Sequence, residues 1–389
     1  MTRRGWVVPM RGRTPGEAHR AVTPLELLFD LVFVVAVAQA ADGLRGEILE
    51  GHAAEAVGAY GGVFFAIWWA WMNFSWFASA YDTDDLFYRL NVFVQLVGAL
   101  ILAAGVPAFL HEQRFGIVTL GYVVIRLAVV AHWLRAAHAD PVHRPTALRY
   151  ALGIGVLQAL WVTSFFVTPE SLNVVGFLLL AAGELTIPIW AERPAPTPWH
   201  PGHIAERYGL FTIIVLGESI FAASLAIASA GDPGRPGGDL VAVAGGGILM
   251  VLSMWWLYFA RSGESAAGAP RRMFTWGYGH YFLWAAAAAV GGGLATAVEQ
   301  AAGSGHVDGK TVGLAVAVPA AIYVLSLWSL DSRRGSSGGT EAWSSAVAVL
   351  LIVAGAFSGF TPLLTGVVLV LLLVLRLRAA GPERRPAER

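Results

Sequence analysis

Long apolar segments separated by short polar ones run through almost the whole of this 389-residue chain. A helix rises 1.5 Å per residue, so about 20 apolar residues cross the hydrocarbon core of a bilayer. Only 13% of the residues are charged, compared with roughly a quarter in a soluble domain. The sequence therefore predicts an all-α fold, a polytopic transmembrane helical bundle of about twelve helices. They are expected at residues 25–41, 57–80, 90–110, 117–136, 148–167, 172–190, 206–229, 239–261, 275–298, 310–330, 343–359 and 361–378.

The last two segments are joined by only a few residues, Phe357 to Pro362, so one long broken helix is the alternative there. An even number of helices places both termini on one side, and most of the 26 Lys and Arg residues then fall on that side. Because positively charged loops face the cytoplasm, we expect a protein of the cytoplasmic membrane with both termini inside the cell. The exceptions are Arg45, Arg114, Arg235 and Lys310 on the other side, and Arg126 within a helix.

The two halves of the chain share an order of features that predicts an internal repeat. Residues 57–107 and 244–298 each contain a Trp-Trp pair followed by a Gly-rich run, and the halves open with Glu26 and Glu206. Chance recurrence in apolar sequence is the alternative. Two copies of a six-helix unit would enter the membrane in the same direction, as in several transporter families. The predicted parts are a cytoplasmic N-terminal arm (1–23), two six-helix repeats (24–191 and 206–378) joined by a Pro-rich linker (192–205), and a disordered C-terminal tail (379–389).

Two acidic residues lie at the start of the first apolar segment. Thr23 followed by Pro24 and then Glu26 is typical of a capping box, in which the Glu side chain bonds back to the backbone at Thr23. Asp30 lies one turn deeper among apolar residues, about 6 Å further along the helix. We expect Asp30 to face protein or a water-filled vestibule, with pairing to a loop arginine as the alternative.

Three further charged residues are predicted near the middle of the membrane. Glu218 and Glu184 each lie well inside an apolar segment, as does Arg126, and an ionised side chain there is costly unless it is paired. Gly217 and Ser219 would let another backbone approach, or let the helix open locally. The alternative is an ion pair of Arg126 with Glu184 or Glu218 that only fixes helix packing. Because acids outnumber arginine, the pattern favours a proton or cation over an anion.

The histidines give weaker indications. His280 is either a titrating group or a hydrogen-bonded residue of an aromatic belt, and we favour the second. His200 and His203 lie near Glu206, but Pro201 and Gly202 argue against the helical spacing that metal ligands use. We therefore expect no metal site.

The second motif region combines aspartates and tryptophans. Asp82, Asp84 and Asp85 crowd a short loop, where capping is favoured over metal binding, and Asp85 is expected to pair with Arg89. The Trp-rich segments are expected to act as interfacial anchors or helix-packing surfaces. These tryptophans are Trp68, Trp69, Trp71, Trp255 and Trp256.

Three motifs in order, TPLELLFDLVFVVAVAQ, WWAWMNFSWFASAYDTDDLFYR and ERYGLFTIIVLGES, resemble the bacterial low temperature requirement A (LtrA) family of multi-pass membrane proteins, over roughly residues 20–380. The resemblance implies a bacterial inner-membrane protein linked to growth in the cold, and it brings no substrate or catalytic residue with it. The positions that match the motifs are Glu26, Asp30, Trp68, Trp69, Asp82, Asp84, Asp85, Arg89, Glu206, Arg207, Gly209, Gly217, Glu218 and Ser219.

From the residues we expect a secondary transporter coupled to a proton or cation, with Glu218, Glu184, Asp30 and Arg126 on its path. Its partners would be the lipid bilayer, the ion and a small solute, without nucleic acid or a cofactor. A non-transporting membrane scaffold or cold-adaptation protein is one alternative. A membrane-embedded lipid-modifying enzyme is less favoured, because the helices offer no nucleophile with a base at a common depth and the chain has no cysteine.

Overall fold

The structure is a computed structural model that describes residues 6–14, 20–169, 172–230, 237–262, 270–303, 307–332 and 339–380. These residues form twelve α-helices and no strand, which confirms the predicted fold class. The helices are α1 (Pro24–Leu49), α2 (Ala53–Tyr81), α3 (Leu86–Glu112), α4 (Gly116–Ala139), α5 (Arg144–Val167), α6 (Asn173–Ala191), α7 (Pro201–Ala230), α8 (Gly237–Ser262), α9 (Pro270–Ala301), α10 (Gly309–Ser332), α11 (Gly339–Gly355) and α12 (Thr361–Ala380).

Ten of these helices are long and apolar enough to cross a bilayer. The two others are α11, which is a shorter apolar helix of 17 residues, and α2. Helix α2 has 29 residues, but it is rich in Trp and Tyr, whose polar atoms lower its hydropathy, and its second half is mostly buried by protein. The chain is therefore a multi-pass membrane protein.

The alternative of one long helix at the C-terminal end is wrong, because α11 and α12 are separate. Gly359 lies between them with φ of +79°, a left-handed conformation that glycine adopts without a steric penalty. Thr361 closes the turn by donating its hydroxyl to the carbonyl of Gly355 at 3.1 Å. Of the predicted tail, residues 379–380 end α12 and the rest lies outside the described residues.

Cα packing divides the chain into two compact units. Unit 1 comprises Met1–Gly43 and Val57–Phe211, and unit 2 comprises Leu44–Ala56 and Thr212–Arg389. Helices α1 and α7 each contribute residues to both units. The predicted repeats at 24–191 and 206–378 have different boundaries from these units, and the internal duplication stays a prediction.

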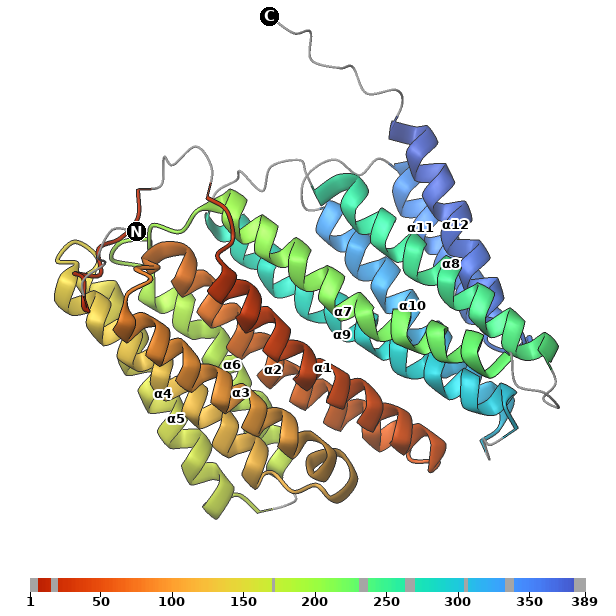
Figure 1. The fold of residues 1–389 in the computed structure, drawn as a ribbon, viewed down its shortest axis with the longest axis horizontal. Coiled ribbons are helices and arrows are strands. Elements are labelled where there is room, and N and C mark those ends of the chain that lie inside the picture. The colour runs from red at the N-terminus through yellow and green to blue at the C-terminus, as the bar shows by residue number, and fades with distance from the viewer. Residues whose placement is uncertain are drawn as a thin grey trace, which may run out of the picture. The chain divides into compact units, whose positions relative to one another are not determined.

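Glycines set the helix packing within unit 1. Helices α3 and α4 lie side by side and antiparallel (Figure 1), and the backbone at Gly121 lies against the backbone of Leu102 and Gly98. A Cβ atom at Gly121 would lie 2.6 Å from the carbonyl oxygen of Gly98, so no larger residue fits without movement. Small residues that let backbones approach are typical of membrane helix interfaces. Helices α4, α5 and α6 continue this layer in sequence order.

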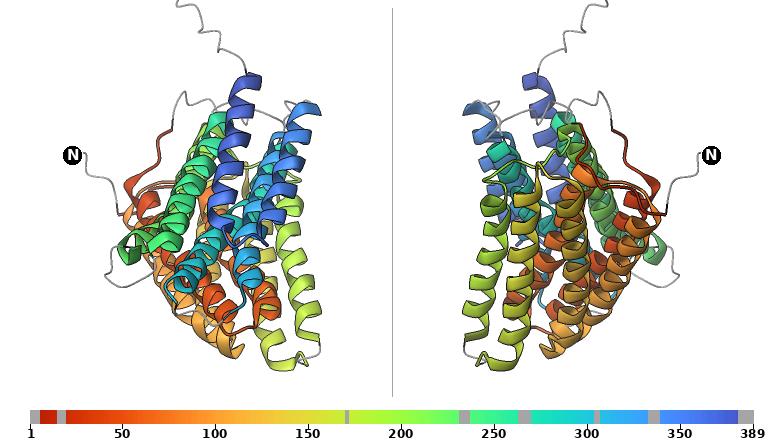
Figure 2. Two further views of the ribbon diagram at one scale, coloured as in Figure 1. Left: turned by 90° about the vertical axis from the view of Figure 1, so that its right-hand side faces the viewer. Right: turned by 90° about the vertical axis from the view of Figure 1, so that its left-hand side faces the viewer.

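Unit 2 uses the same device. Helix α12 packs beside α8 (Figure 2), with Gly246 of α8 against the backbone of Pro362 and Gly366 of α12 close to the carbonyl of Gly246. Helix α9 packs against α10, where Gly293 lies against the backbone of Ala315. Close backbone contact between helices is therefore a feature of the packing within each unit.

Candidate functional site: two buried ion pairs beside helix α2

The first buried ion pair of unit 1 joins Asp30 of α1 to Arg207 of α7. Arg207 Nη2 donates to Asp30 Oδ1 at 2.5 Å, and both side chains are fully buried. Trp71 Nε1 donates to the same carboxylate oxygen at 2.7 Å, and Arg207 Nη2 also donates to Ser75 Oγ at 3.1 Å. Among the described residues, Asp30 Oδ2 and Arg207 Nε and Nη1 have no hydrogen-bond partner. The partner of Asp30 is thus an arginine within a helix and not the loop arginine considered from the sequence.

Glu26 adds a second carboxylate to this pair. The predicted capping box is confirmed: the backbone N–H of Thr23 donates to Glu26 Oε2 at 2.8 Å, and the N–H of Glu26 donates to Thr23 Oγ1 at 3.3 Å. The same carboxylate lies 3.1 Å from His203 Nε2, 3.4 Å from Arg20 Nη2 and 3.6 Å from Arg207 Nη1. Glu26 therefore caps α1, as expected, and also pairs with surrounding cations, which the sequence analysis did not anticipate.

Asp82 extends this cluster at the loop between α2 and α3. Its Oδ2 lies 3.6 Å from Arg20 Nη2. Burial and the nearby Glu26 carboxylate raise the pKa of Asp82 to about 6, against the opposing effect of Arg20. Asp82 is thus an acid whose charge changes close to neutral pH at the edge of the cluster.

Asp85 is the N-cap of α3, as expected. Its Oδ1 accepts the backbone N–H of Tyr88 at 2.9 Å, while Oδ2 accepts the N–H of Val8 at 2.8 Å. Arg135 pairs with both carboxylate oxygens. Burial raises the pKa of Asp85, but the hydrogen bonds from Arg135, Val8 and Tyr88 outweigh it, so the pKa lies below its ordinary value.

The predicted pairing of Asp85 with Arg89 is wrong. Arg89 Nε and Nη2 donate to the two oxygens of Asp84 at 2.7 and 3.0 Å. The reason is the cap: both oxygens of Asp85 are already engaged, and the partly exposed Asp84 is the acid left for Arg89.

The second buried ion pair of unit 1 joins Glu184 of α6 to Arg126 of α4. Arg126 Nη2 donates to Glu184 Oε2 at 2.5 Å, and Trp69 Nε1 donates to the same oxygen at 3.0 Å. Gln158 Nε2 and the Tyr122 hydroxyl donate to Oε1 at 3.1 and 3.4 Å. The pairing of Arg126 with Glu184, offered from the sequence as an alternative to a role in transport, is present. Four donors fill both oxygens of this carboxylate.

Helix α2 contributes a tryptophan to each ion pair. Trp69 and Trp71 are two residues apart, which is about 200° around a helix, so they project from opposite faces. Trp69 donates to Glu184 and Trp71 donates to Asp30. These indoles are fully buried, so they are packing and hydrogen-bonding groups and not interfacial anchors. Trp255 and Trp256 of α8 are exposed, and their role as anchors stays a prediction. The Trp-x-Trp spacing could have indicated this arrangement, but the sequence does not say what lies on either face.

The start of α7 explains the two neighbouring histidines. Pro201 is the first residue of α7, so the last five residues of the predicted linker are helical. His200 Nδ1 accepts the backbone N–H of His203 at 3.2 Å, which caps the helix. The expectation that Pro201 and Gly202 prevent helical spacing was therefore wrong, because both residues are helical. Nδ1 of His200 is nevertheless not free for a metal, because it accepts the hydrogen bond that caps the helix. Glu206, the proposed counterpart of Glu26, lies exposed in the second turn.

Glu218 lies in unit 2, on a part of α7 that continues without a break through Gly217. A Cβ at Gly217 would meet nothing within 4 Å, so this glycine does not provide the expected close approach. Gly291 of α9 provides it instead, because a Cβ there would lie 2.7 Å from Glu218 Cβ. Ser219 is buried beside α9, with its hydroxyl 3.5 Å from the carbonyl of Ala287, whereas Glu218 is half-buried.

His280 of unit 2 is buried and hydrogen-bonded, as favoured from the sequence, while its place in an aromatic belt stays a prediction. Its Nδ1 lies 2.9 Å from the carbonyl oxygen of Trp276, and its Nε2 lies 3.1 Å from the Tyr258 hydroxyl. Because a carbonyl only accepts, Nδ1 carries the proton and Nε2 accepts from Tyr258.

One group of potential metal ligands is present among the described residues, and the sequence analysis did not single it out. Glu47, Glu50 and His52 follow one another around the end of α1, with ligand atoms within 4.8 Å of one another. Glu50 and His52 are exposed, and His52 Nδ1 already lies 3.4 Å from Glu47 Oε2.

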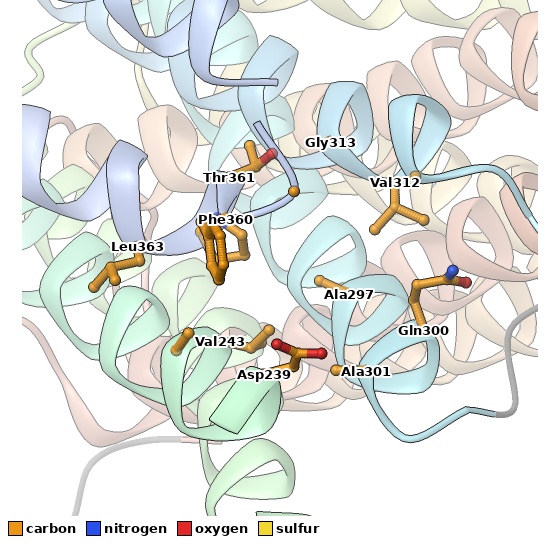
Figure 3. A pocket seen from close by; sticks show the side chains of 14 residues that line it. Asp239, Val243, Ala297, Gln300, Ala301, Val312, Gly313, Phe360, Thr361 and Leu363 are labelled. Atoms are coloured by element: carbon orange, nitrogen blue, oxygen red, sulfur yellow. The ribbon is translucent and has the colours of Figure 1, made fainter. Parts of the chain in front are cut away.

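Each unit also contains a cavity. In unit 1, an apolar cavity of about 70 Å³ is lined mainly by aromatic rings, including Trp161, Phe177 and Tyr122, whose hydroxyl donates to Glu184. In unit 2, a cavity of about 210 Å³ lies among α8, α9, α10 and α12, with Asp239 and Phe360 on its walls (Figure 3). The cavity in unit 1 adjoins the ion pair of Arg126 and Glu184, whereas no ion pair lines the described cavity in unit 2.

A bundle of apolar helices long enough to cross a bilayer, with ionised side chains paired in its interior, defines a multi-pass helical membrane protein. The model of the family described as bacterial low temperature requirement A protein (LtrA) matches residues 21–377, so the chain belongs to this family. The chain is also 30% identical over 299 residues to an uncharacterized protein of Rhizobium meliloti (strain 1021), covering 71% of this chain and 68% of that protein. No solved structure matches the chain.

Proposed function

We propose that the protein is a secondary transporter in which Asp30, opposed by Arg207, takes up and releases the coupling proton. The protein would lie in the cytoplasmic membrane with both termini in the cytoplasm, in keeping with the uneven distribution of its basic residues. The co-transported solute would be small, in keeping with the cavities of about 70 and 210 Å³ described above.

One observation carries the proposal: one carboxylate oxygen of Asp30 accepts hydrogen bonds and the other accepts none from the described residues. Oδ1 accepts from both Arg207 and Trp71, whereas Oδ2 is buried without a donor among the described residues. A proton could therefore bind Oδ2 without displacing either donor from Oδ1. Intramembrane acids are costly to keep, and in transporters they commonly act as proton relays.

Glu184 differs from Asp30 in this respect. Its two oxygens accept from four side chains, so protonation would have to displace a donor. We infer that Glu184 holds Arg126 in place and does not exchange the proton. Of Glu184 and Asp30, which the sequence analysis both placed on the ion path, we therefore keep only Asp30. The place of Glu218 on the path stays a prediction from the sequence; the proposal itself needs only Asp30 for proton exchange, and Glu218 lies half-buried in unit 2.

We propose further that the protein is not an enzyme. Thr23 Oγ1 donates to Glu26 Oε2 at 3.0 Å as part of the capping box, and Ser75 Oγ accepts from Arg207, so both hydroxyls have structural roles. A nucleophilic hydroxyl needs a base that is free to remove its proton, and the Glu26 carboxylate is already engaged by the backbone of Thr23, by Arg20 and by His203. A membrane scaffold that transports nothing would contain the same ion pairs. An experiment therefore has to distinguish a scaffold from a transporter.

The test is proton flux into liposomes that contain the purified protein, driven by an imposed pH gradient and potential and followed with an internal pH dye. We expect flux with the wild type and none with Asp30→Asn, which preserves the size of the side chain and its contact with Trp71. Both proteins must first elute as single species in detergent. Equal flux in the two would refute the role of Asp30, and no flux in either would favour the scaffold.

A further inference from the structure

We propose that a chain of internal water molecules runs between α3 and α4, along Tyr88, His132 and Gln95, and conducts the proton that Asp30 exchanges. This inference rests on the proposed function and names the route by which the proton moves away from the ion pair toward the middle of unit 1.

Three buried polar side chains between these helices have no protein partner among the described residues. They are the hydroxyl of Tyr88, both ring nitrogens of His132 and both amide atoms of Gln95. His132 and Gln95 are fully buried and Tyr88 is 1% exposed. Nearly all buried polar groups in proteins are hydrogen-bonded to protein or to ordered water, so five such atoms in one interface indicate water.

The three side chains lie in a row. On α3, Tyr88 and Gln95 are seven residues apart, which places them on one face, about 10 Å apart along the axis. Asn91 lies between them and donates to the carbonyl of Ala128 at 2.9 Å, which fixes the register against α4. His132 is one turn from Ala128 toward Tyr88, and the rings of Tyr88 and His132 are 5.0 Å apart. From His132 to Gln95 is about 6 to 12 Å along the axis, a gap that a short chain of waters bridges.

The near end of the row reaches the charged cluster. Tyr88 lies in the first turn of α3, and its backbone N–H donates to Asp85 Oδ1 at 2.9 Å. In the loop just before this turn, Asp82 Oδ2 lies 3.6 Å from Arg20 Nη2, and Arg20 also pairs with Glu26. The row therefore begins among the groups that surround the proton-exchanging acid.

The far end lies close to the second ion pair. Gly98 lies against both Gly121 and Ile125, and Gly105 lies against Val118, so Arg126, the residue after Ile125, lies at about the same level as Gln95 along the axis. Arg126 Nε and Nη1 and Gln158 Oε1 are again buried without a protein partner. Because Glu184 neutralises Arg126, the guanidinium can donate to water there without presenting a net charge to an approaching proton.

Proton transfer along this chain returns each member to its original charge and leaves His132 in its other tautomer and each water reoriented, so that rotation of these groups resets the chain for the next proton. Each water accepts one proton and donates another, and neutral His132 accepts a proton on one ring nitrogen and releases the proton of the other. A purely structural role does not explain the imidazole. The His132 ring stacks on the Phe77 ring, with the ring centroids 4.9 Å apart. A phenylalanine in place of His132 would pack there as well, although it has no polar atoms.

The first test is radiolytic hydroxyl-radical labelling of the full-length wild type in liposomes, read by mass spectrometry, because radicals form where water is present. Tyr88 and His132 should be labelled well above two controls with equal burial and hydrogen-bonded atoms, Tyr323 and His280. Labelling of Tyr88 and His132 no greater than that of the controls would overturn the inference.

The second test is proton flux in His132→Phe and, as the control, in His280→Phe. We expect a loss of about tenfold or more with His132→Phe, and flux within about twofold of wild type with His280→Phe. Flux unchanged by His132→Phe would overturn conduction along this row while leaving transport through Asp30 intact. Labelled Tyr88 without any wild-type flux would show water between α3 and α4 but refute proton transport, so the two failures are distinguishable.

Discussion

Arg207 and Asp30 are 177 residues apart in the sequence, yet Arg207 Nη2 donates to Asp30 Oδ1 at 2.5 Å in the interior of unit 1. Asp30 belongs to the first of the three motifs described above and Arg207 to the third. Trp71, which donates to the same oxygen of Asp30, belongs to the second. The three motifs therefore build one site, and Arg207 is the residue that joins them.

The ion pair should behave as a unit in unfolding experiments. Arg207→Gln leaves the Asp30 carboxylate buried without its cation, which we expect to lower the free energy of unfolding by about 3–5 kcal/mol. Asp30→Asn combined with Arg207→Gln removes both charges and should recover part of this loss. Denaturant unfolding in detergent measures the cycle, and strictly additive effects would show that the pair is not coupled.

The buried indoles of α2 should be more important than the exposed ones of α8. Trp69→Phe and Trp71→Phe each remove a hydrogen bond to a carboxylate and should destabilise the protein by about 1–3 kcal/mol. Trp255→Phe is the control, since Trp255 is 44% exposed, and we expect a change within about 0.5 kcal/mol. Thermal unfolding in detergent tests the order, which would be contradicted by equal losses in all three variants.

Helix packing in unit 1 should depend on Gly121. In Gly121→Ala the added methyl meets the backbone of Leu102 and Gly98, and overpacking of this kind costs about 1–3 kcal/mol. A Cβ at Gly155 of α5 meets nothing within 4 Å, so Gly155→Ala should be neutral or stabilising. The melting temperature should therefore fall in Gly121→Ala and stay the same or rise in Gly155→Ala.

Asp82 should make the stability depend on pH. Its pKa is raised in the folded protein to about 6 from 3.8, so the folded state binds the proton more tightly than the unfolded state. The free energy of unfolding should thus fall as the pH rises through the window from about 4 to 6, by up to about 3 kcal/mol from this group. Asp82→Asn removes the effect, so the stability difference between variant and wild type should change across that window. A constant difference would contradict the raised pKa.

The sequence predicted the helices well because apolar length is a strong and local signal. It predicted the capping box of Glu26 for the same reason, since all of its atoms lie within four residues. The pairing of Arg126 with Glu184 could be proposed only as one of two possibilities, because the partner of a buried charge depends on which helices are neighbours.

Other parts of the site depend on contacts between distant segments and could not be derived in advance. Arg207 was noted only as a motif position, because its charge lies near a predicted helix start, where arginine is ordinary. The row formed by Tyr88, His132 and Gln95 was missed entirely. Each of these residues is unremarkable alone, and the row appears only when α3 and α4 are placed in register.

The most direct test of the account compares proton flux in Asp30→Asn and Glu218→Gln side by side in liposomes, since each variant neutralises one intramembrane acid and changes little else. The account predicts that Asp30→Asn abolishes flux while Glu218→Gln, in unit 2, keeps most of it. Flux that survives Asp30→Asn and is lost in Glu218→Gln would contradict it, and would place the proton path at the half-buried acid of α7 instead.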